Sequence, residues 1–567
     1  MYLDFMIKIP EEESGISKKT IKGTTYVYYE YGRKYIAEKK YNIPQCTSVG
    51  KISTEDPTMM IPNGNYLKYF PDAELPEELP ESVRSGCLRI GSYLIIKKII
   101  RYYKLEEKLE GIIGKDTGLF LDLATYAIVT ENNAGQYYPD YAYRHPLFTA
   151  EMKVYSDSKV SRFLREISRD DSIHFQNEWN EAHDHREKIY ISYDSTNKHC
   201  QAGNIELAES GHEKEKEGKP IYNYAIAYDK SNRLPLFYEE YSGSINDVSQ
   251  LQYLLEKAKA YGYKKAGFIL DRGYFSEGNI RFMDRNHFDF LIMIKGCKDL
   301  VNELILKNRG TFEDERKYAI PFYGVNGTTL KARMYDADET DRWIHIYYSD
   351  SKKAKERSKL EETIEHQKAF LQKFLGKNFA DEKEYSTYFD LIFYHEGQAD
   401  QKLQVIREKQ DVISREIKLC GYFAIVTSAE MSAAEALDLY KSRDCSEKLF
   451  RGDKSYLGEK SMRVYATEPL HAKIFIEFVA LIIRNKIYTC LKDRMKATGK
   501  RENYMTVPAA IKELNKIELM RQADGVYRLD HAITAKQKEI LQAFNLTTMD
   551  VNKEAVELGN ILRTLTA

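Results

Sequence analysis

The sequence predicts an α/β protein whose main part is a mixed sheet, preceded by a β-rich and a helical segment and followed by a helical end. Between residues 186 and 296, short apolar runs of strand length alternate with stretches of helical periodicity. Before residue 56, runs rich in tyrosine and threonine are separated by turn residues, which is typical of a small antiparallel sheet. The 567 residues suffice for several domains or for one large domain with insertions.

The first 182 residues divide into two segments. Residues 1–80 are interpreted as a β-rich module that ends in a linker, because residues 70–81 are rich in proline and glutamate. Residues 84–182 are interpreted as a helical region. Its helices are expected at residues 93–103, 117–131 and 158–167. The middle helix is apolar enough to lie in a core, whereas the other two have basic edges.

The part from residue 186 is predicted to alternate strands and helices. Strands are expected at residues 188–194, 221–228, 234–241, 266–271 and 289–294, and helices at residues 247–261 and 277–286. This order is that of a ribonuclease-H-like core, in which Asp194 lies on the central first strand and Asp271 at the end of the fourth. Residues 202–220, charged and glycine-containing, are expected to form a projecting hairpin or a DNA contact.

Asp194 and Asp271 are candidate metal ligands. Each is predicted to end an apolar strand, and Asp271 is followed by a glycine turn at Gly273. Two carboxylates at a fixed backbone edge, still open to water and phosphate, suit a divalent cation. The sequence therefore predicts a metal site at this edge.

A second candidate group follows a predicted helix start. Ser432-Ala-Ala-Glu435 has the spacing of a capping box, and it precedes Tyr440. If the helix runs unbroken through Gly452, four side chains fall within a sector about 60° wide. They are Tyr440, Arg443, Glu447 and Lys454. By itself such a cluster is more often a solvated ion-pair face than a functional site.

The motifs that contain these residues carry a resemblance to a known family. The YDST sequence around Asp194, the DRGY sequence that begins at Asp271 and the Y-x2-R-x3-E-x6-K run from Tyr440 resemble the three catalytic motifs of DDE insertion-sequence transposases. The last motif matches the cut-and-paste group named for its Y-R-E-K residues at all four positions, with the group's spacing. The resemblance covers roughly residues 185–490.

Further phrases fit the group, and one stretch departs from it. The fitting phrases are Pro235, residues 243–247, residues 421–427, Arg463-Val-Tyr465 and His471. Asp444, Cys445 and Ser446 stand where the group more often has bulky apolar residues beside the glutamate, which concerns the packing of that helix.

The resemblance implies how the chain is divided. The ribonuclease-H-like core would comprise residues 186–296 and 421–490, with a β-rich insertion domain at 297–420, a helical DNA-binding region at 84–182 and a helical end at 491–567. Within the insertion, β-like segments are expected at residues 317–323, 328–335 and 342–348, followed by a long charged helix at residues 352–374. Trp343 is a candidate for stacking on DNA, although alternation with His345 and Tyr347 favours a core or sheet-face role. Trp179 is expected in the core.

The resemblance also implies the chemistry. Asp194, Asp271 and Glu447 would hold two Mg²⁺ ions, with Mn²⁺ expected to substitute, and Asp194 would bridge them. Tyr440, Arg443 and Lys454 would hold phosphates near the cleaved end. The partners would be double-stranded DNA, at the transposon ends and at the target, and a second copy of the chain as a homodimer on DNA.

Composition limits how DNA could be bound. The formal charge is −1 and the pI is about 6.9, so binding depends on local basic patches. The clearest patch, residues 484–501, has seven Lys and Arg residues against Asp493, and Arg484 and Lys486 in it are candidate DNA contacts.

Cysteine usage and hydropathy bear on location. The seven cysteines are scattered and include no C-x-x-C pair, which favours reduced thiols in a cytosolic setting and excludes a zinc knuckle. The longest apolar stretch, residues 474–483, is interrupted by Glu477 and is predicted to be a buried helix rather than a membrane span. We expect a cytoplasmic, nucleoid-associated prokaryotic protein.

Three other interpretations remain. The chain could be a DNA-binding regulator that kept this fold without catalysis, a stand-alone metal-dependent nuclease, or a protein whose three carboxylates are only structural. The presence of all three carboxylates together with Tyr440, Arg443 and Lys454 disfavours the first, and the insertion and N-terminal segments disfavour the second.

Overall fold

The computed structural model describes most of the chain. Described are residues 6–10, 14–21, 23–36, 41–53, 56–71, 73, 85–183, 188–199, 205–210, 219–245, 247–263, 265–294, 298–335, 338, 340–379, 382–394, 401–442, 462–501, 504–521 and 527–565. For Asp194 the description covers the backbone. The predicted linker at residues 70–81 and the predicted loop at residues 202–220 lie largely outside these ranges, as do the C-terminal members of the Tyr440 motif.

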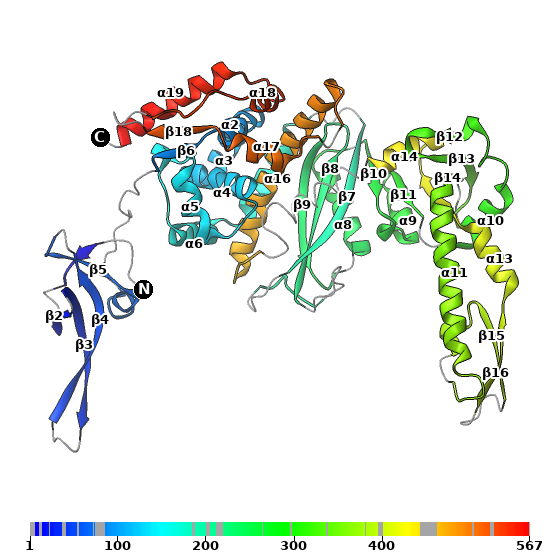
Figure 1. Cartoon of the computed structure of the whole chain (residues 1–567), viewed down its shortest axis with the longest axis horizontal. Helices are drawn as coiled ribbons and strands as arrows, with labels where there is room; N and C mark the ends of the chain where they lie inside the picture. Colours follow the sequence, from blue (N-terminus) through cyan, green and yellow to red (C-terminus); the bar gives the residue numbers. More distant parts are fainter. Residues whose placement is uncertain are drawn as a thin grey trace.

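The N-terminal residues form a five-stranded antiparallel sheet in the order β1-β5-β4-β3-β2 (Figure 1). Its elements are β1 (Ile7–Lys8), β2 (Ile16–Ile21), β3 (Thr24–Ile36), β4 (Tyr41–Ile52), β5 (Met59–Pro62) and the short helix α1 (Gly64–Tyr69). Val27, Val49, Met60 and Tyr66 form a small separate core. The predicted β-rich character of this segment is confirmed.

Helices follow, as the periodicity predicts. They are α2 (Gly91–Tyr103), α3 (Leu105–Ile113), α4 (Thr117–Thr130), α5 (Tyr138–Arg144), α6 (Asp157–Glu166) and α7 (Arg169–Glu181). α4 is buried on nearly all sides because its side chains are apolar around the whole circumference. Trp179 on α7 is buried, as predicted.

The C-terminal part differs from the predicted independent helical end. Helix α16 (Thr467–Ala497) runs across the expected boundary at residue 491, and Phe475 on it packs against Phe120 of α4. Strands β18 (Glu518–Arg521) and β19 (Tyr527–Leu529), which were not predicted, form a sheet with β6 (Cys87–Arg89). The remaining helices are α17 (Val507–Leu514), α18 (Ala535–Gln542) and α19 (Thr548–Leu565).

The helices α2–α7 and α16–α19 therefore form one helical body (Figure 1). Gly91 at the start of α2 meets α17 so closely that a Cβ there would lie 2.3 Å from the Leu514 carbonyl oxygen, which only glycine avoids. Strand pairing between residues far apart in sequence cannot be seen in local periodicity, which explains why this sheet was missed.

The central sheet has nine strands in the order β12-β13-β14-β17-β11-β10-β7-β8-β9. The elements of this part that come first along the chain are β7 (Ile189–His199), β8 (Ile221–Asp229), β9 (Leu234–Ser242), α8 (Asp247–Ala260), β10 (Ala266–Leu270), α9 (Glu277–Arg285) and β11 (Asp289–Met293). All five strands and both helices were predicted. β10 is parallel to β7 and β11, whereas β8 is antiparallel to both β7 and β9. β7 continues five residues beyond Asp194, so the prediction that Asp194 ends its strand is wrong.

The β-like segments expected in an insertion domain instead extend this sheet. They form β13 (Val325–Ala332) and β14 (Arg342–Tyr348), and β14 pairs with β17 (Tyr422–Thr427), which pairs with β11. The first expected segment, residues 317–323, is mostly 3-10 turns around the two-residue strand β12 (Ala319–Ile320). Backbone hydrogen bonds between β14 and β17 thus join what the sequence analysis separated.

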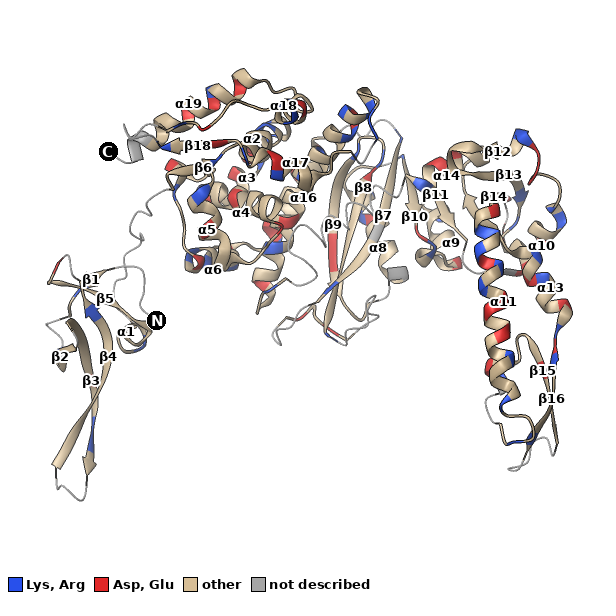
Figure 2. Cartoon of the chain, viewed as in Figure 1, with Lys and Arg blue, Asp and Glu red and all other residues tan. Residues whose placement is uncertain are grey.

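The rest of the insertion comprises α10 (Lys298–Asn308), whose Ile305 lies in the main core, and a projecting arm. The arm's elements are α11 (Asp350–Gln372), α12 (Glu382–Tyr385), β15 (Phe389–Tyr394), β16 (Lys402–Glu408) and α13 (Gln410–Leu419). α11 is the predicted long charged helix, and acidic and basic residues are interspersed along it (Figure 2). The arm has its own apolar core around Ile364, Leu371 and Leu403.

No helix within the described ranges combines the length and apolar character that crossing a bilayer requires.

Candidate functional site

Backbone register brings the two predicted aspartates together. Leu270 of β10 pairs with Tyr193 of β7 in a parallel ladder, so the next position on each strand is Asp271 and Asp194. Neighbouring strands are about 4.8 Å apart. Residues 77 positions apart in the sequence therefore stand side by side on adjacent strands.

Asp271 lies where β10 gives way to a 3-10 turn, Arg272–Tyr274. The residue is half-buried and extended, and its Oδ1 accepts a 2.7 Å hydrogen bond from the Arg272 amide. That bond caps the turn and fixes the carboxylate at the carboxyl end of the strand. Here β10 leaves the sheet while β7 continues to His199, and ligands of open α/β sheets bind outside the carboxyl ends of such strands.

The helix that the capping box predicts is present. α14 (Ala433–Lys441) starts at Ser432, whose hydroxyl accepts from the Glu435 amide at 3.2 Å, while the Glu435 carboxylate accepts from the Ser432 amide at 2.8 Å. The hydrogen bonds that the Glu435 carboxylate accepts from the Ser432 amide and hydroxyl lower the pKa of Glu435. The helix ends at Lys441, so the prediction of one unbroken helix from Ser432 through Gly452 is wrong, and Tyr440 lies in its last turn. Arg443, Glu447 and Lys454 lie outside the described residues.

Tyr440 is in the core rather than on an open surface. Its side chain is in the apolar cluster that α14 forms with one face of the sheet, including Ile269 and Leu291, and the residue is only 6% exposed. Its hydroxyl lies 3.7 Å from the Met293 Sδ. Sequence analysis treated Tyr440 as one of four polar neighbours and missed this packing.

Met293 connects Tyr440 to the aspartates. Because Leu270 pairs with Ile292, the next positions across the ladder are Asp271 and Met293. Asp194, Asp271 and Met293 thus form one row across three adjacent strands. The hydroxyl of Tyr440, in the last turn of α14, therefore lies next to the last residue of that row.

A cavity of about 580 Å³ opens at the same edge. Its lining includes Arg272, Met293 and Lys441, the residues that follow or adjoin the row, together with Lys352 and Glu356 of α11. Lys352 is paired with Glu356, and Arg272 and Lys441 add further positive charge to the lining. An anionic ligand would meet positive charge on entering this cavity. Arg272 could have been found from the sequence, since it directly follows Asp271.

The other predicted DNA contacts lie elsewhere. Trp343 is half-buried on β14, where the Lys331 Nζ lies 4.0 Å from its ring centroid, and its neighbours His345 and Tyr347 are buried. The predicted sheet-face position is therefore confirmed. Whether this residue contacts DNA stays a prediction.

The basic patch on α16 is less open than its sequence suggests. Arg484 is only 8% exposed, and its charge opposes the rise that burial imposes on the pKa of Glu131. Lys486 lies over the ring of Tyr102, with its Nζ 4.3 Å from the centroid. The sequence pattern could not distinguish a buried arginine from a solvated one.

A buried ion pair, which the sequence analysis did not identify, fixes the strand that carries Asp194. Lys198, four residues further along β7 and 1% exposed, donates to the Glu477 carboxylate of α16 at 2.6 Å. Asn133 donates to the other oxygen at 3.1 Å. Glu477 was read only as the interruption of an apolar stretch. It ties β7, α16 and the end of α4 together.

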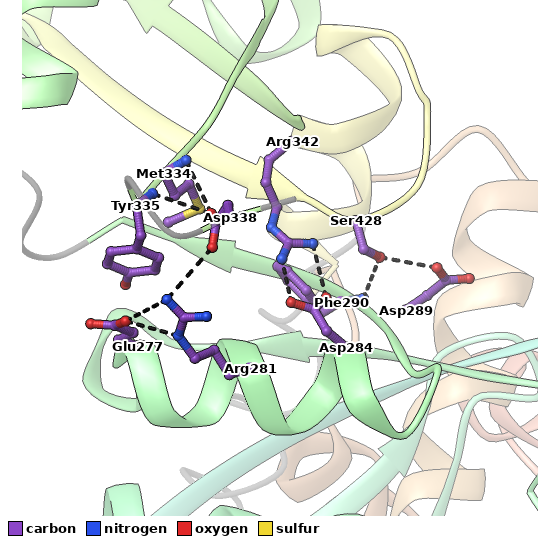
Figure 3. A network of polar contacts seen from close by, with 10 residues as sticks. All are labelled: Glu277, Arg281, Asp284, Asp289, Phe290, Met334, Tyr335, Asp338, Arg342 and Ser428. Atoms are coloured by element: carbon purple, nitrogen blue, oxygen red, sulfur yellow. Dashed lines mark hydrogen bonds and ion pairs between the residues drawn. The ribbon is translucent and has the colours of Figure 1, made fainter. Parts of the chain in front are cut away.

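A second polar network attaches the sheet extension to the core (Figure 3). Arg342 at the start of β14 makes paired hydrogen bonds to Asp284 of α9, one of them 2.8 Å long. Arg281, also on α9, pairs with Glu277 at 2.7 Å and lies 4.0 Å from Asp338. The network fixes the position of β14 relative to α9.

The donor set at the row fits a hard divalent cation. Two carboxylate residues on adjacent strands, at an edge that a cation-lined cavity reaches, offer the oxygen ligands that Mg²⁺ prefers. Within the described side chains there is no group of three or more potential metal ligands. The Asp194 side chain and Glu447 fall outside that set.

Comparisons with known proteins identify a family for this chain. The model of a family described as "Transposase DDE domain" matches residues 187–483, more than half of the chain. None of the curated proteins matches. Among solved structures, the chain is similar to a piggyBac transposase synaptic complex with hairpin DNA, at 9% identity over 75% of this chain and 77% of that one, with a TM-score of 0.37.

Proposed function

Because this chain belongs to the transposase DDE domain family, we propose that it is a cut-and-paste DNA transposase of the Y-R-E-K group. It binds the terminal inverted repeats of its element, cleaves at the ends and joins the liberated 3′-OH strands to target DNA. The proposal rests above all on one observation, the register that sets Asp194 beside Asp271.

The topology supports a ribonuclease-H-like catalytic core. Taken in chain order, the strands β7 to β11 are arranged 3-2-1-4-5, with only the second antiparallel to the first. In this arrangement the first and fourth strands are neighbours, and each carries one aspartate.

Asp194, Asp271 and Glu447 are the proposed ligands of two Mg²⁺ ions, for which Mn²⁺ would substitute. When bound, such ions help to deprotonate an attacking hydroxyl and neutralise the leaving oxygen of a phosphodiester. The aspartates hold their positions because both are fixed by strand backbone. Glu447 completes the set from the segment that leaves α14 beside Met293.

The flanking residues position the DNA. Arg443 and Lys454 are the proposed phosphate contacts, and Arg272 and Lys441 add positive charge at the cavity edge. The burial of Tyr440 favours a role in fixing where the 443–461 segment starts. Arg484, Lys486 and Trp343 are retained as weaker DNA contacts. The chain would act as a homodimer that holds two ends, in the cytoplasm of a prokaryote at its nucleoid.

The test replaces each ligand without changing its size. Asp194→Asn, Asp271→Asn and Glu447→Gln are each expected to lower cleavage of a duplex that carries the DNA bordering the encoding gene by at least 100-fold in Mg²⁺, because an amide is a poor ligand for a hard cation. Binding of that duplex should stay within a few-fold of the unaltered chain.

Asp299→Asn is the matched control, since Asp299 is exposed at the start of α10 and is not among the residues that line the cavity. It should cleave normally. Full cleavage by any of the three ligand variants would remove that residue from the proposed site, and absence of cleavage by the unaltered chain in Mg²⁺ and Mn²⁺ would remove the transposase proposal.

A further inference from the structure

Strands β3 and β4 of the N-terminal sheet extend well beyond the part in which all five strands pair. β2 covers residues 24–29 of β3, and β5, whose other edge pairs with β1, covers residues 50–52 of β4. Beyond those residues β3 and β4 pair with each other alone, from Glu30–Cys46 out to Ile36–Tyr41. We call residues 30–36 and 41–46 the ribbon; it extends away from the sheet in Figure 1.

Tyr31 stacks on Tyr69 of α1, but the side chains further out on the ribbon are largely uncovered. Tyr35 and Tyr41 are 60% and 54% exposed, and Arg33, Lys34 and Asn42 are exposed as well. A two-stranded ribbon buries little of its own surface and is only marginally stable alone. A sequence this rich in tyrosine on an uncovered ribbon points to a partner.

The charge of the strands favours an anionic partner. In β2, β3 and β4 the charged residues are Lys18, Lys19, Arg33, Lys34 and Lys51 against the single acid Glu30. The Glu30 carboxylate accepts a 2.6 Å hydrogen bond from the Arg33 Nε, so its charge is compensated. The whole chain has a formal charge of −1, so this excess is local. Two copies of such a surface would repel each other.

The alternation of side chains gives the ribbon one face suited to reading bases. Tyr35 pairs with Asn42 and Arg33 with Pro44, so these four residues share a face, and Lys34 and Ile43 lie on the other. Arginine and asparagine form paired hydrogen bonds with guanine and adenine edges. A β-bulge between Glu30 and Gly32 adds twist where the ribbon leaves the sheet.

We propose that the ribbon enters the major groove of DNA and reads sequence through Arg33 and Asn42. The major groove is about 12 Å wide and admits a two-stranded antiparallel ribbon. Lys18 and Lys19, exposed on the neighbouring strand β2, contact phosphates and set the depth of insertion. This inference rests on the proposed function only in taking the DNA to be the ends of the chain's own element.

The experiment uses the full chain and a pool of randomised duplexes. Sequences enriched by the unaltered chain are compared with scrambled duplexes by competition at fixed salt. Arg33→Ala combined with Asn42→Ala should reduce the preference for the enriched sequence by about 30-fold or more, because each base contact contributes roughly 1–3 kcal/mol of discrimination. Affinity for scrambled duplex should change little.

Lys18→Ala combined with Lys19→Ala should weaken both duplexes alike and make the slope of log affinity against log salt shallower by about 1.8. Lys8→Ala is the matched control, because Lys8 is an exposed lysine of the same sheet on β1, outside the ribbon and β2. Lys8→Ala should leave both the preference for the enriched sequence and the slope of log affinity against log salt nearly unchanged.

The outcomes separate this proposal from the catalytic one. If the ribbon variants keep full discrimination, or if the unaltered chain enriches no sequence, the ribbon does not read DNA, whatever the cleavage assays give. If the ribbon variants lose discrimination while the unaltered chain fails to cleave any duplex, the ribbon proposal stands and the transposase proposal falls. A ribbon variant that changes self-association while binding DNA normally would overturn the DNA assignment.

Discussion

At the scale of single residues, burial decides what a polar side chain can do. Tyr440 and Arg484 both look like surface groups in the sequence, yet each is less than a tenth exposed. Tyr440 packs on the sheet through its ring, and its hydroxyl reaches Met293. The main effect of such a residue is to fix the backbone around it.

His345 makes stability depend on pH. The ring is buried between Thr329 and Thr427, 2.9 and 3.0 Å from their hydroxyl oxygens. The Thr427 hydroxyl donates to the Ala429 carbonyl, so its oxygen accepts from the His345 Nε2–H and the ring is held neutral. Burial lowers the pKa of His345 to about 4, below its ordinary value of 6.5.

Between these two values the unfolded chain binds a proton that the folded chain does not. The stabilisation that comes from keeping His345 neutral is therefore complete above pH 6.5, and it is lost as the pH falls from 6.5 towards 4. The loss in the free energy of unfolding is a few kcal/mol at most, at roughly 1.4 kcal/mol for each unit of pKa difference. His345→Gln should flatten the fall in melting temperature between pH 7 and pH 5, measured by thermal unfolding. His531→Gln, at an exposed histidine, should leave it unchanged. Equal pH dependence in all three proteins would contradict the assignment.

At the scale of elements, β7 matters because three neighbours fix it. β10 pairs with β7 along one edge, and β8 pairs with β7 along the other. The Lys198–Glu477 ion pair holds the C-terminal part of β7 to α16. The pair is nearly inaccessible, and Lys473 one turn before Glu477 has its pKa lowered to about 8, mainly by burial. Buried charges of this kind stabilise only as a complete set.

Breaking that set should be costly. Lys198→Met leaves the Glu477 carboxylate buried with Asn133 and the nearby Lys473, and we expect a loss of about 3–5 kcal/mol in the free energy of unfolding. Lys198→Met combined with Glu477→Leu should recover most of it, because no unpaired charge remains. Urea unfolding of the single and double variants measures the coupling. If the double variant is as unstable as the sum of the singles, the two residues do not act as a pair.

At the scale of the whole molecule, the chain closes on itself. α16 supplies core residues both to the sheet and to helices α2–α7, and β18 pairs with β6, more than 400 residues away. Residues 84–182 therefore share one core with residues 467–565. A fragment of residues 1–180 lacks that core, so DNA recognition by the N-terminal region is properly tested in the full chain.

Removing the C-terminal segment should expose this dependence. Deletion of residues 504–567 takes away β18, the Asn515 partner of Ser92 and the Glu554 partner of Lys97, and uncovers the apolar face of α2. We expect most of the protein to be recovered as aggregate, and the soluble part to unfold at a markedly lower temperature.

Deletion of residues 1–73 is the control, because β1–β5 have a core of their own. That variant should unfold at the same temperature as the full chain. A stable, soluble protein after the C-terminal deletion would show that residues 491–567 form a separate unit after all.

The sequence by itself determined the order of strands and helices from residue 188 to residue 294, the capped start of α14 and the two strands with their aspartates. These features depend on side-chain periodicity and on hydrogen bonds between close neighbours, which are written locally in the chain. Only the tertiary structure decided that Asp194, Asp271 and Met293 form one row, that Tyr440 is buried, and that β14 and β6 join distant strands. Those results depend on pairing between remote segments, and the backbone register that sets them leaves no local pattern.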